Sequence, residues 1–360
     1  MTQGRESGGA EQAGKSPTCC CARRPETAGE APPPPPPASA GGTGTAFRWI
    51  ALPAGRFLMG MSGAEGFAGD GEGPARLVTL SPFRVSAYAV TNAQFADFVR
   101  AIGHVTEAER FNWSYVFHAL VPPQTAARIE RMPVQAPWWL PVAFAYWAQP
   151  EGPGTTVLDR LDHPVVHVSW NDAVAFCTWS GTRLLTEAEW EYAARGGLDG
   201  KLYPWGDGLA PGGQHRCNIW QGTFPDLNTA EDGYVGTAPV HAFEPNDYGL
   251  FNVAGNVWEW VRDVFSPEYH RATGDHDPVH DGPGASRSMR GGSYLCHSSY
   301  CNRYRVAARN SNTPNSSPFG HTASGSAAAN RDDRFICLFQ VLNFCTDPIK
   351  RIVPAARYMA

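Results

Sequence analysis

Turn-forming residues follow one another through most of the chain beyond residue 197, with little helical or strand periodicity between them. The 360 residues include 38 glycines and 31 prolines, which interrupt regular elements, and 12 tryptophans, which can pack a core. We therefore predict an α+β domain with few helices, short strands and low secondary-structure content. Long ordered loops in a compact domain usually need something to hold them, and bound ions are one candidate.

Regular elements are predicted mainly in the first half of the chain. Short strands are expected at 49–52, 56–60 and 77–80. Helices are expected at 91–102, 171–181 and 186–196. The first helix opens with a capping box, in which Thr91 and Gln94 satisfy each other's backbone N–H groups, and Gly103 supplies a left-handed stop. A similar box at Thr186 opens the third helix.

The amino-terminal segment differs from this pattern. Residues 1–46 are rich in Gly, Ala and Pro, with six consecutive prolines at 32–37, and this tail is predicted to be disordered. No secretory signal peptide and no apolar run of membrane-spanning length are found, so we expect a soluble, cytoplasmic monomer without membrane contact. The net charge of −5 and the charged content of 18% argue against a nucleic-acid partner, which would need a basic face.

Nine cysteines are present, an odd number at irregular spacings, which is a poor disulfide framework for this length. Most are therefore expected to be buried thiols, and those at 19–21 to be incidental. Cys296 and Cys301 are the exception. Their spacing places them on opposite faces of a strand and roughly 140° apart on a helix, so they meet only in a loop. If they meet, they can form a disulfide or bind a soft metal such as Cu(I), and spacing alone does not decide between these.

The segment 291–309, which contains both cysteines, resembles the active-site signature of formylglycine-generating enzymes. Further blocks match that family in its order: Trp-Trp-Leu-Pro at 138–141, His-Val-Ser-Trp-Asn-Asp at 167–172, Thr-Glu-Ala-Glu-Trp-Glu-Tyr at 186–192, Asn-Ile-Trp-Gln-Gly at 218–222 and Gly-Asn-Val-Trp-Glu-Trp at 255–260. The resemblance implies a single domain at 47–320, related to the C-type-lectin-like fold. Several blocks occur in non-oxidase relatives, and the two cysteines mark the oxidase branch.

The resemblance implies a copper-dependent oxidase that uses O2 to convert the cysteine of a Cys-x-Pro-x-Arg segment in type I sulfatases to formylglycine. Cys296 and Cys301 would hold Cu(I) as thiolates, and the substrate thiol would become a third sulfur ligand. A hydrogen would leave the substrate β-carbon, and the resulting thioaldehyde would hydrolyse. Four further side chains would shape the oxygen and substrate pocket: Ser293, His297, Tyr300 and Trp258. Aromatic packing and loop hydrogen bonding explain His297 and Tyr300 equally well.

Two calcium sites are also implied by the resemblance. One comprises Asn218, Ile219, Asp232 and Tyr234, and the other comprises Asn252, Gly255, Val257 and Glu259. Calcium takes about six to eight oxygen ligands, which carbonyl-rich loops can supply. The alternative interpretation is that Asn, Asp and Gly build ordinary turns here.

The chain departs from the family near its carboxyl end. Family members close the domain with a Gly-Phe-Arg strand, whereas residues 321–360 form an atypical tail without further resemblance. Codons that could encode 323–328, read from their third base, give Ile-Gly-Phe-Arg-Cys, so a frameshift is a hypothesis that DNA sequencing tests.

The missing strand would also affect Cys177. In some relatives the cysteine at the position of Cys177 pairs with the cysteine that follows the Gly-Phe-Arg strand. Loss of a core strand is expected to lower the stability.

Two other functions fit the sequence. The first is a non-catalytic calcium-binding module on the same scaffold, or an inactive truncated family member, and the presence of both cysteines argues against it. The second is a structural zinc site built from Cys296, His297 and Cys301 with an unidentified fourth ligand. Metal analysis of protein purified without oxygen separates copper, calcium alone and zinc.

Overall fold

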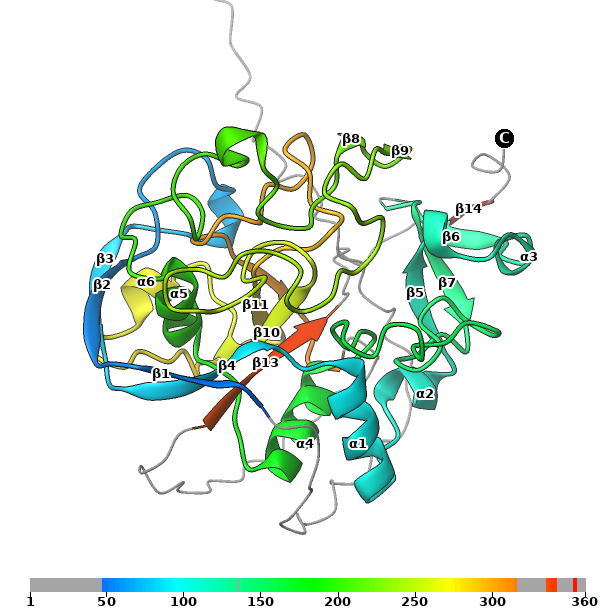
Figure 1. Ribbon diagram of the computed structural model, residues 1–360, viewed down its shortest axis with the longest axis horizontal. Helices are drawn as coiled ribbons and strands as arrows, with labels where there is room; N and C mark the ends of the chain where they lie inside the picture. The colour runs from blue at the N-terminus through cyan, green and yellow to red at the C-terminus, as the bar shows by residue number, and fades with distance from the viewer. Residues whose placement is uncertain (1–46, 135, 316–334, 342–351, 355–360) are drawn as a thin grey trace, which may run out of the picture.

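The computed structural model describes residues 47–134, 136–315, 335–341 and 352–354. The predicted disordered tail at 1–46 lies outside these residues, as does most of 321–360. Helices and strands are mixed in one domain whose length is mostly loop, as the sequence predicts (Figure 1). None of the described helices has the length and apolar character needed to cross a membrane.

A six-stranded sheet forms the centre of the domain, in the order β1-β4-β13-β10-β11-β12 (Figure 1). Its strands are β1 (Trp49–Leu52), β4 (Phe83–Ala89), β13 (Phe335–Val341), β10 (Trp258–Val264), β11 (Arg287–Arg290) and β12 (Asn310–Asn312). Neighbouring strands are antiparallel except β13 and β4, which are parallel. Because β11 and β12 are neighbours, the loop 291–309 that joins them leaves and returns at one edge of the sheet.

Strand β13 comes from the segment that the sequence analysis sets apart as an atypical tail. Phe335 pairs with Arg84 of β4, and Phe339 pairs with Trp260 of β10. The strand therefore supplies backbone partners to both neighbours, which would otherwise have unpaired N–H and C=O groups. This pairing corrects the expectation that the sheet is left without a closing strand. The frameshift hypothesis about the gene stays a prediction.

Smaller elements accompany the sheet. The two-stranded pairs are β2 (Gly55–Met59) with β3 (Arg76–Leu80), β5 (Trp113–Phe117) with β7 (Trp139–Ala143), β6 (Arg131–Pro133) with β14 (Ile352–Pro354), and β8 (Gly222–Thr223) with β9 (Leu227–Asn228). The α-helices are α1 (Asn92–Ile102), α2 (Glu107–Phe111), α3 (Pro123–Ala126), α4 (Trp170–Ser180), α5 (Glu187–Arg195) and α6 (Tyr269–Ala272). The 3-10 turns are η1 (Ala68–Asp70), η2 (His118–Leu120) and η3 (Pro211–Gly213).

Local capping explains where the helices begin and end. The capping boxes at Thr91 and Thr186 are both present, and Gly103 ends α1 with a φ of 66°. Helix α4 begins one residue before the predicted position because Ser169 is its N-cap. The Ser169 hydroxyl accepts from the Asp172 N–H, while the Asp172 carboxylate accepts from the Ser169 N–H. The three predicted helices and three predicted strands are confirmed within about one residue at each start.

The helices bury two different kinds of surface. Phe95 of α1 stacks on Phe176 of α4, with ring centroids 6.1 Å apart. Helix α5 instead buries charged side chains, since Glu187, Glu191 and Arg195 are each 2% exposed or less. Buried charges need partners. Arg195 pairs with Glu191 within the helix, whereas Glu187 and Glu191 also pair with arginines outside it: Arg290, which directly precedes the loop 291–309, and Arg309, which ends it.

Candidate active site

Cys296 and Cys301 meet in the loop between β11 and β12. Their sulfur atoms are 3.2 Å apart, and both residues are 0% exposed. An S–S bond is about 2.05 Å long, so the sulfurs touch without forming a disulfide. The Cys296 N–H donates to the Ser293 carbonyl at 2.9 Å, and the Cys301 N–H donates to the His297 carbonyl at 2.8 Å. The loop that the five-residue spacing requires is confirmed.

Two glycines allow this loop to fold back on itself. Gly291 and Gly292 follow β11 with φ values of 91° and 77°, which favour glycine. A Cβ atom at Gly292 would lie 3.0 Å from the backbone of Arg303 and Tyr304. The beginning and the end of the cysteine loop can therefore pack directly against each other.

The two buried sulfurs form a donor set that suits a soft metal such as Cu(I). Across the part of the chain that the structure describes, no group of three or more His, Cys, Asp or Glu side chains is placed to hold a metal. His297 is turned to a different partner, with its Nδ1 2.8 Å from the Ser299 hydroxyl. The structure therefore gives no support to the zinc alternative.

The other predicted pocket residues lie close to the cysteines in sequence or in the core. The Ser293 N–H lies 3.4 Å from the Cys296 sulfur, and Ser293 is buried. Trp258 begins β10 in the same buried cluster as both cysteines, and its Nε1–H has no acceptor among the described residues. His297 is half-buried, and burial lowers its pKa below the usual value. Their catalytic roles stay predictions.

An aromatic cluster, formed by Trp138, Trp220, Phe224 and Tyr300, borders the cysteine loop. Tyr300 stacks on Phe224 with ring centroids 4.6 Å apart, and Trp138 meets Tyr300 edge-on at 5.2 Å. The ring of Trp220 lies 5.3 Å from that of Phe224, measured between centroids. The backbone N–H of Trp220 donates to the Cys296 carbonyl at 3.1 Å. Tyr300 is one of the predicted pocket residues, whereas Phe224 was not predicted because it lies outside every family block.

A cavity of about 190 Å³ adjoins this cluster. It is lined by His297, Ser298 and Tyr304 of the cysteine loop and by Arg216 and Trp220 from the segment before β8. A cavity of this size holds more than a single water molecule, so it can take part of a ligand. The cavity lies against the residues that separate the two cysteines in the chain.

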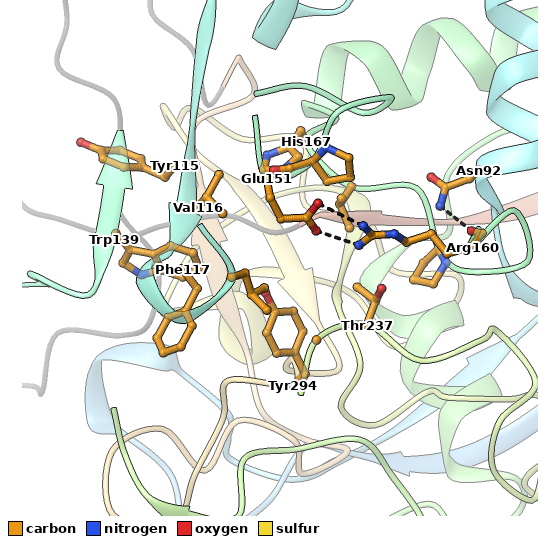
Figure 2. Close-up of a pocket in the computed structure, with 15 residues that line it drawn as sticks. Asn92, Tyr115, Val116, Phe117, Trp139, Glu151, Arg160, His167, Thr237 and Tyr294 are labelled. Atoms are coloured by element: carbon orange, nitrogen blue, oxygen red, sulfur yellow. Dashed lines mark hydrogen bonds and ion pairs between the residues drawn. The ribbon is translucent and has the colours of Figure 1, made fainter. Parts of the chain in front are cut away.

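A smaller cavity of about 50 Å³ is lined by neither cysteine (Figure 2). Figure 2 shows Glu151 and Arg160 joined by two hydrogen bonds, of 2.7 and 3.0 Å. His167 lies with its Nδ1 2.9 Å from the Ser114 hydroxyl and its Nε2 2.8 Å from the Pro150 carbonyl. These polar groups satisfy one another, and we assign them no chemistry.

Buried ion pairs form a second border of the cysteine loop. Arg303 donates from Nε and Nη2 to the Asp70 carboxylate at 2.5 and 3.0 Å, and its Nη1 lies 3.8 Å from the Cys301 sulfur. Arg305 pairs with Glu72 at 2.5 and 2.7 Å. These four residues were not among the predicted site residues. The arginines at 303 and 305 could have indicated buried acidic partners, because arginine is almost never fully buried unless it is paired.

The residues predicted for the first calcium site are brought together. The Asp232 carboxylate accepts from the Ile219 N–H at 3.0 Å and from the Tyr234 N–H at 2.9 Å. Asn218 is 1% exposed, and its Oδ1 has no hydrogen-bond donor among the described residues. A buried amide oxygen without a donor is costly unless a cation or water binds it, so the site fits a hard cation.

The second predicted calcium site adjoins the first. Asn252, Val257 and Glu259 are buried, and the Asn252 Oδ1 also lacks a donor among the described residues. A Cβ atom at Gly255 would lie 2.3 Å from the Asn218 carbonyl oxygen, so these loops approach closely. Both asparagine oxygens therefore need a cation or a water molecule as a partner. Calcium itself remains a proposal.

Comparisons with known proteins identify the family. The family model of the Sulfatase-modifying factor enzyme 1-like domain matches residues 39–319. The chain is 59% identical over 282 residues to a formylglycine-generating enzyme of Thermomonospora curvata, covering 78% of this chain and 92% of the relative. It is 54% identical over 270 residues to that of Bos taurus, covering 75% and 72%.

Two further relatives extend the comparison. An inactive C-alpha-formylglycine-generating enzyme 2 of Mus musculus is 46% identical over 289 residues, covering 79% of this chain and 87% of the relative. Among solved structures, PvdO from Pseudomonas aeruginosa matches with a TM-score of 0.53 and 26% identity, covering 77% of this chain and 94% of that one. The family model and the identities show that the chain belongs to the formylglycine-generating enzyme (sulfatase-modifying factor) family.

Proposed function

We propose that this protein converts the cysteine of a Cys-x-Pro-x-Arg segment in a type I sulfatase to formylglycine, with Cu(I) as cofactor and O2 as oxidant. The observation that carries the proposal is the buried contact between the Cys296 and Cys301 sulfurs, 3.2 Å apart. Relatives that share 59% and 54% identity and are named formylglycine-generating enzymes support the reaction.

The cysteine pair would bind the metal and keep it from solvent. Cys296 and Cys301 would hold Cu(I) through sulfur, the donor type that this ion prefers. When bound, Cu(I) supplies one-electron chemistry with O2 that side chains cannot provide. Ser293 and His297 fix the turns that bring the sulfurs together, and both sulfurs lie where water has no access. A metal held by the pair would therefore lie in a dry environment.

The aromatic cluster would bind the substrate segment beside the cysteines. Trp138 and Tyr300 are only partly buried, so their rings are able to contact a peptide. Aromatic rings offer a large contact area, and those of Tyr300 and Phe224 already support each other by stacking. The cavity next to His297 and Ser298 would accept a side chain of that segment.

An inactive family member is the alternative function, because a relative described in that way shares 46% identity. The contact between both thiols favours the oxidase. We also propose calcium at both predicted sites, on the evidence of the Asn218 and Asn252 oxygens that lack donors. Calcium there would stabilise the folded loops by mass action rather than take part in the chemistry.

Single substitutions of the two cysteines test the proposed reaction. Cys296→Ser or Cys301→Ser is expected to abolish aldehyde formation on a Cys-x-Pro-x-Arg peptide, because one sulfur ligand is lost. The melting temperature should change little, since neither residue forms a disulfide. Cys177→Ala is the matched control: this buried thiol lies in α4, and it should leave peptide turnover intact. Near-normal turnover in either serine variant counts against the mechanism.

A further inference from the structure

We propose that Arg303, held in place by Asp70, is a positioning residue that orients the Cys301 sulfur towards Cys296. The inference rests on the proposed function for its importance, because metal binding needs both sulfurs at one point. The position of the guanidinium group, however, stands on contacts within this chain alone.

The guanidinium group of Arg303 is almost fully buried. Its Nε and Nη2 donate to the Asp70 carboxylate at 2.5 and 3.0 Å, and its Cζ atom lies over the Phe67 ring, 4.0 Å from the ring centroid. One edge and one face of this planar group are therefore occupied, which fixes its rotation. The remaining nitrogen, Nη1, is the one that lies 3.8 Å from the Cys301 sulfur.

The segment that carries Asp70 is itself held against the cysteine loop. Asp70 lies 233 positions before Arg303 in the chain, in the turn η1. Arg309 donates from Nη1 to the carbonyls of Asp70 and Gly71 at 2.8 and 2.9 Å, and Asn302 donates to the Glu65 carbonyl at 2.7 Å. This segment is therefore fastened to the cysteine loop at several points, so Asp70 cannot drift away from Arg303.

A neighbouring ion pair, Arg305 with Glu72, has the same chemistry. Arg305 binds the Glu72 carboxylate with both terminal nitrogens, at 2.5 and 2.7 Å, and its Nε donates to the Asn302 carbonyl at 3.1 Å. Arg305 and Arg303 are each 3% exposed or less, and both fasten the cysteine loop to the same distant segment. The two arginines differ in that the Nη1 atom of Arg303 contacts the Cys301 sulfur. Arg305 is therefore a matched control for purely structural clamping.

The experiment compares Arg303→Lys with Arg305→Lys in the full chain. Lysine keeps the charge but cannot bind Asp70 with two nitrogens and reach the sulfur with a third. In metal-free protein, the equilibrium between the two thiols and their disulfide is measured in glutathione buffers. Two thiols give two electrons and two protons to one oxidised glutathione, which becomes two reduced molecules. Cu(I) affinity is then measured without oxygen, by competition with a coloured chelator.

We expect Arg303→Lys to shift the glutathione equilibrium towards the disulfide and to weaken Cu(I) binding, each by about tenfold, because a charge-assisted hydrogen bond to sulfur is lost. Arg305→Lys should change both by less than about twofold while lowering the melting temperature to a similar degree. If the two variants behave alike in both measurements, Arg303 is a structural clamp only and the proposal is overturned.

Two further measurements apply if a variant does not fold or if the protein binds no Cu(I). If Arg303→Lys does not fold, the double variant Asp70→Asn with Arg303→Gln replaces the buried pair by neutral partners and is measured in the same way. If the unsubstituted protein binds no Cu(I), the proposed function fails, but the glutathione equilibrium still decides the role of Arg303.

Discussion

Two regions border the cysteine loop and hold it by different interactions. The charged network consists of ion pairs at 2.5 to 3.1 Å whose members are almost fully buried: Asp70, Glu72, Glu187, Glu191, Arg195, Arg290, Arg303, Arg305 and Arg309. The aromatic cluster uses ring contacts at 4.6 to 5.3 Å, and three of its members, Trp138, Phe224 and Tyr300, are partly exposed. The charged network is buried, and its interactions are directional. The aromatic cluster is partly exposed, and its ring contacts tolerate small displacements.

The difference follows from what each interaction demands. Removing one partner from a buried ion pair leaves a charge without compensation, which is costly, so the network permits little displacement. Burial would raise the pKa of Glu187, but the charges of Arg309 and Arg290 outweigh burial and hold that pKa well below its ordinary value. A ring contact contributes only about 0.5–1.5 kcal/mol and survives small shifts. We infer that the network fixes the sulfurs while the aromatic cluster adapts to a substrate.

The largest expected effect is on the charged network. Glu187→Ala should lower the free energy of unfolding by about 3–5 kcal/mol, because Arg290 and Arg309 lose a fully buried partner. Glu189→Ala, two residues along the same helix, is the control. It removes an N-cap contact and a pairing with the partly exposed Arg183, and should cost about 1 kcal/mol. Urea unfolding measures both, and equal losses would remove the contrast between the two regions.

Calcium removal tests whether the loops behind the aromatic cluster are held by ions. Trp220 directly follows Asn218 and Ile219 of the first proposed site. Chelation with EDTA should lower the melting temperature, since a ligand present at 100 times its Kd stabilises the folded state by about 2.7 kcal/mol. Asp232→Ala should weaken this response. Melting curves that coincide with and without calcium would reduce both sites to ordinary turns.

The smallest expected effect on stability is at the aromatic cluster. Tyr300→Ala removes the contacts with Phe224 and Trp138 and should lower the free energy of unfolding by about 1–2 kcal/mol. The KM for the substrate peptide should rise more than kcat falls. Tyr300→Phe keeps both ring contacts and should stay close to the unsubstituted protein. If the Phe variant loses turnover as severely as the Ala variant, the hydroxyl group takes part in the chemistry.

The sequence predicts local structure well where a few neighbouring residues supply the hydrogen bonds. The boxes at Thr91 and Thr186 position α1 and α5 because both partners lie within three residues of each other. A further box, Thr106 with Glu109, begins α2 and was missed because that helix is only five residues long and shows little periodicity. The five-residue spacing of the cysteines likewise required a loop, because neither a strand nor a helix lets the side chains meet.

By itself, the sequence determined the starts of α1, α4 and α5 to within about one residue, the early strands β1, β2 and β3, the family and the need for a cysteine loop. Only the tertiary structure decided that the sulfurs lie 3.2 Å apart, that Asp70 reaches Arg303 across 233 positions, and that β13 lies parallel to β4. The physical reason is the separation along the chain of the residues that interact. Caps and turns are fixed by bonds between near neighbours, whereas ion pairs and strand order depend on which distant segments the whole core brings together, and no local pattern encodes that choice.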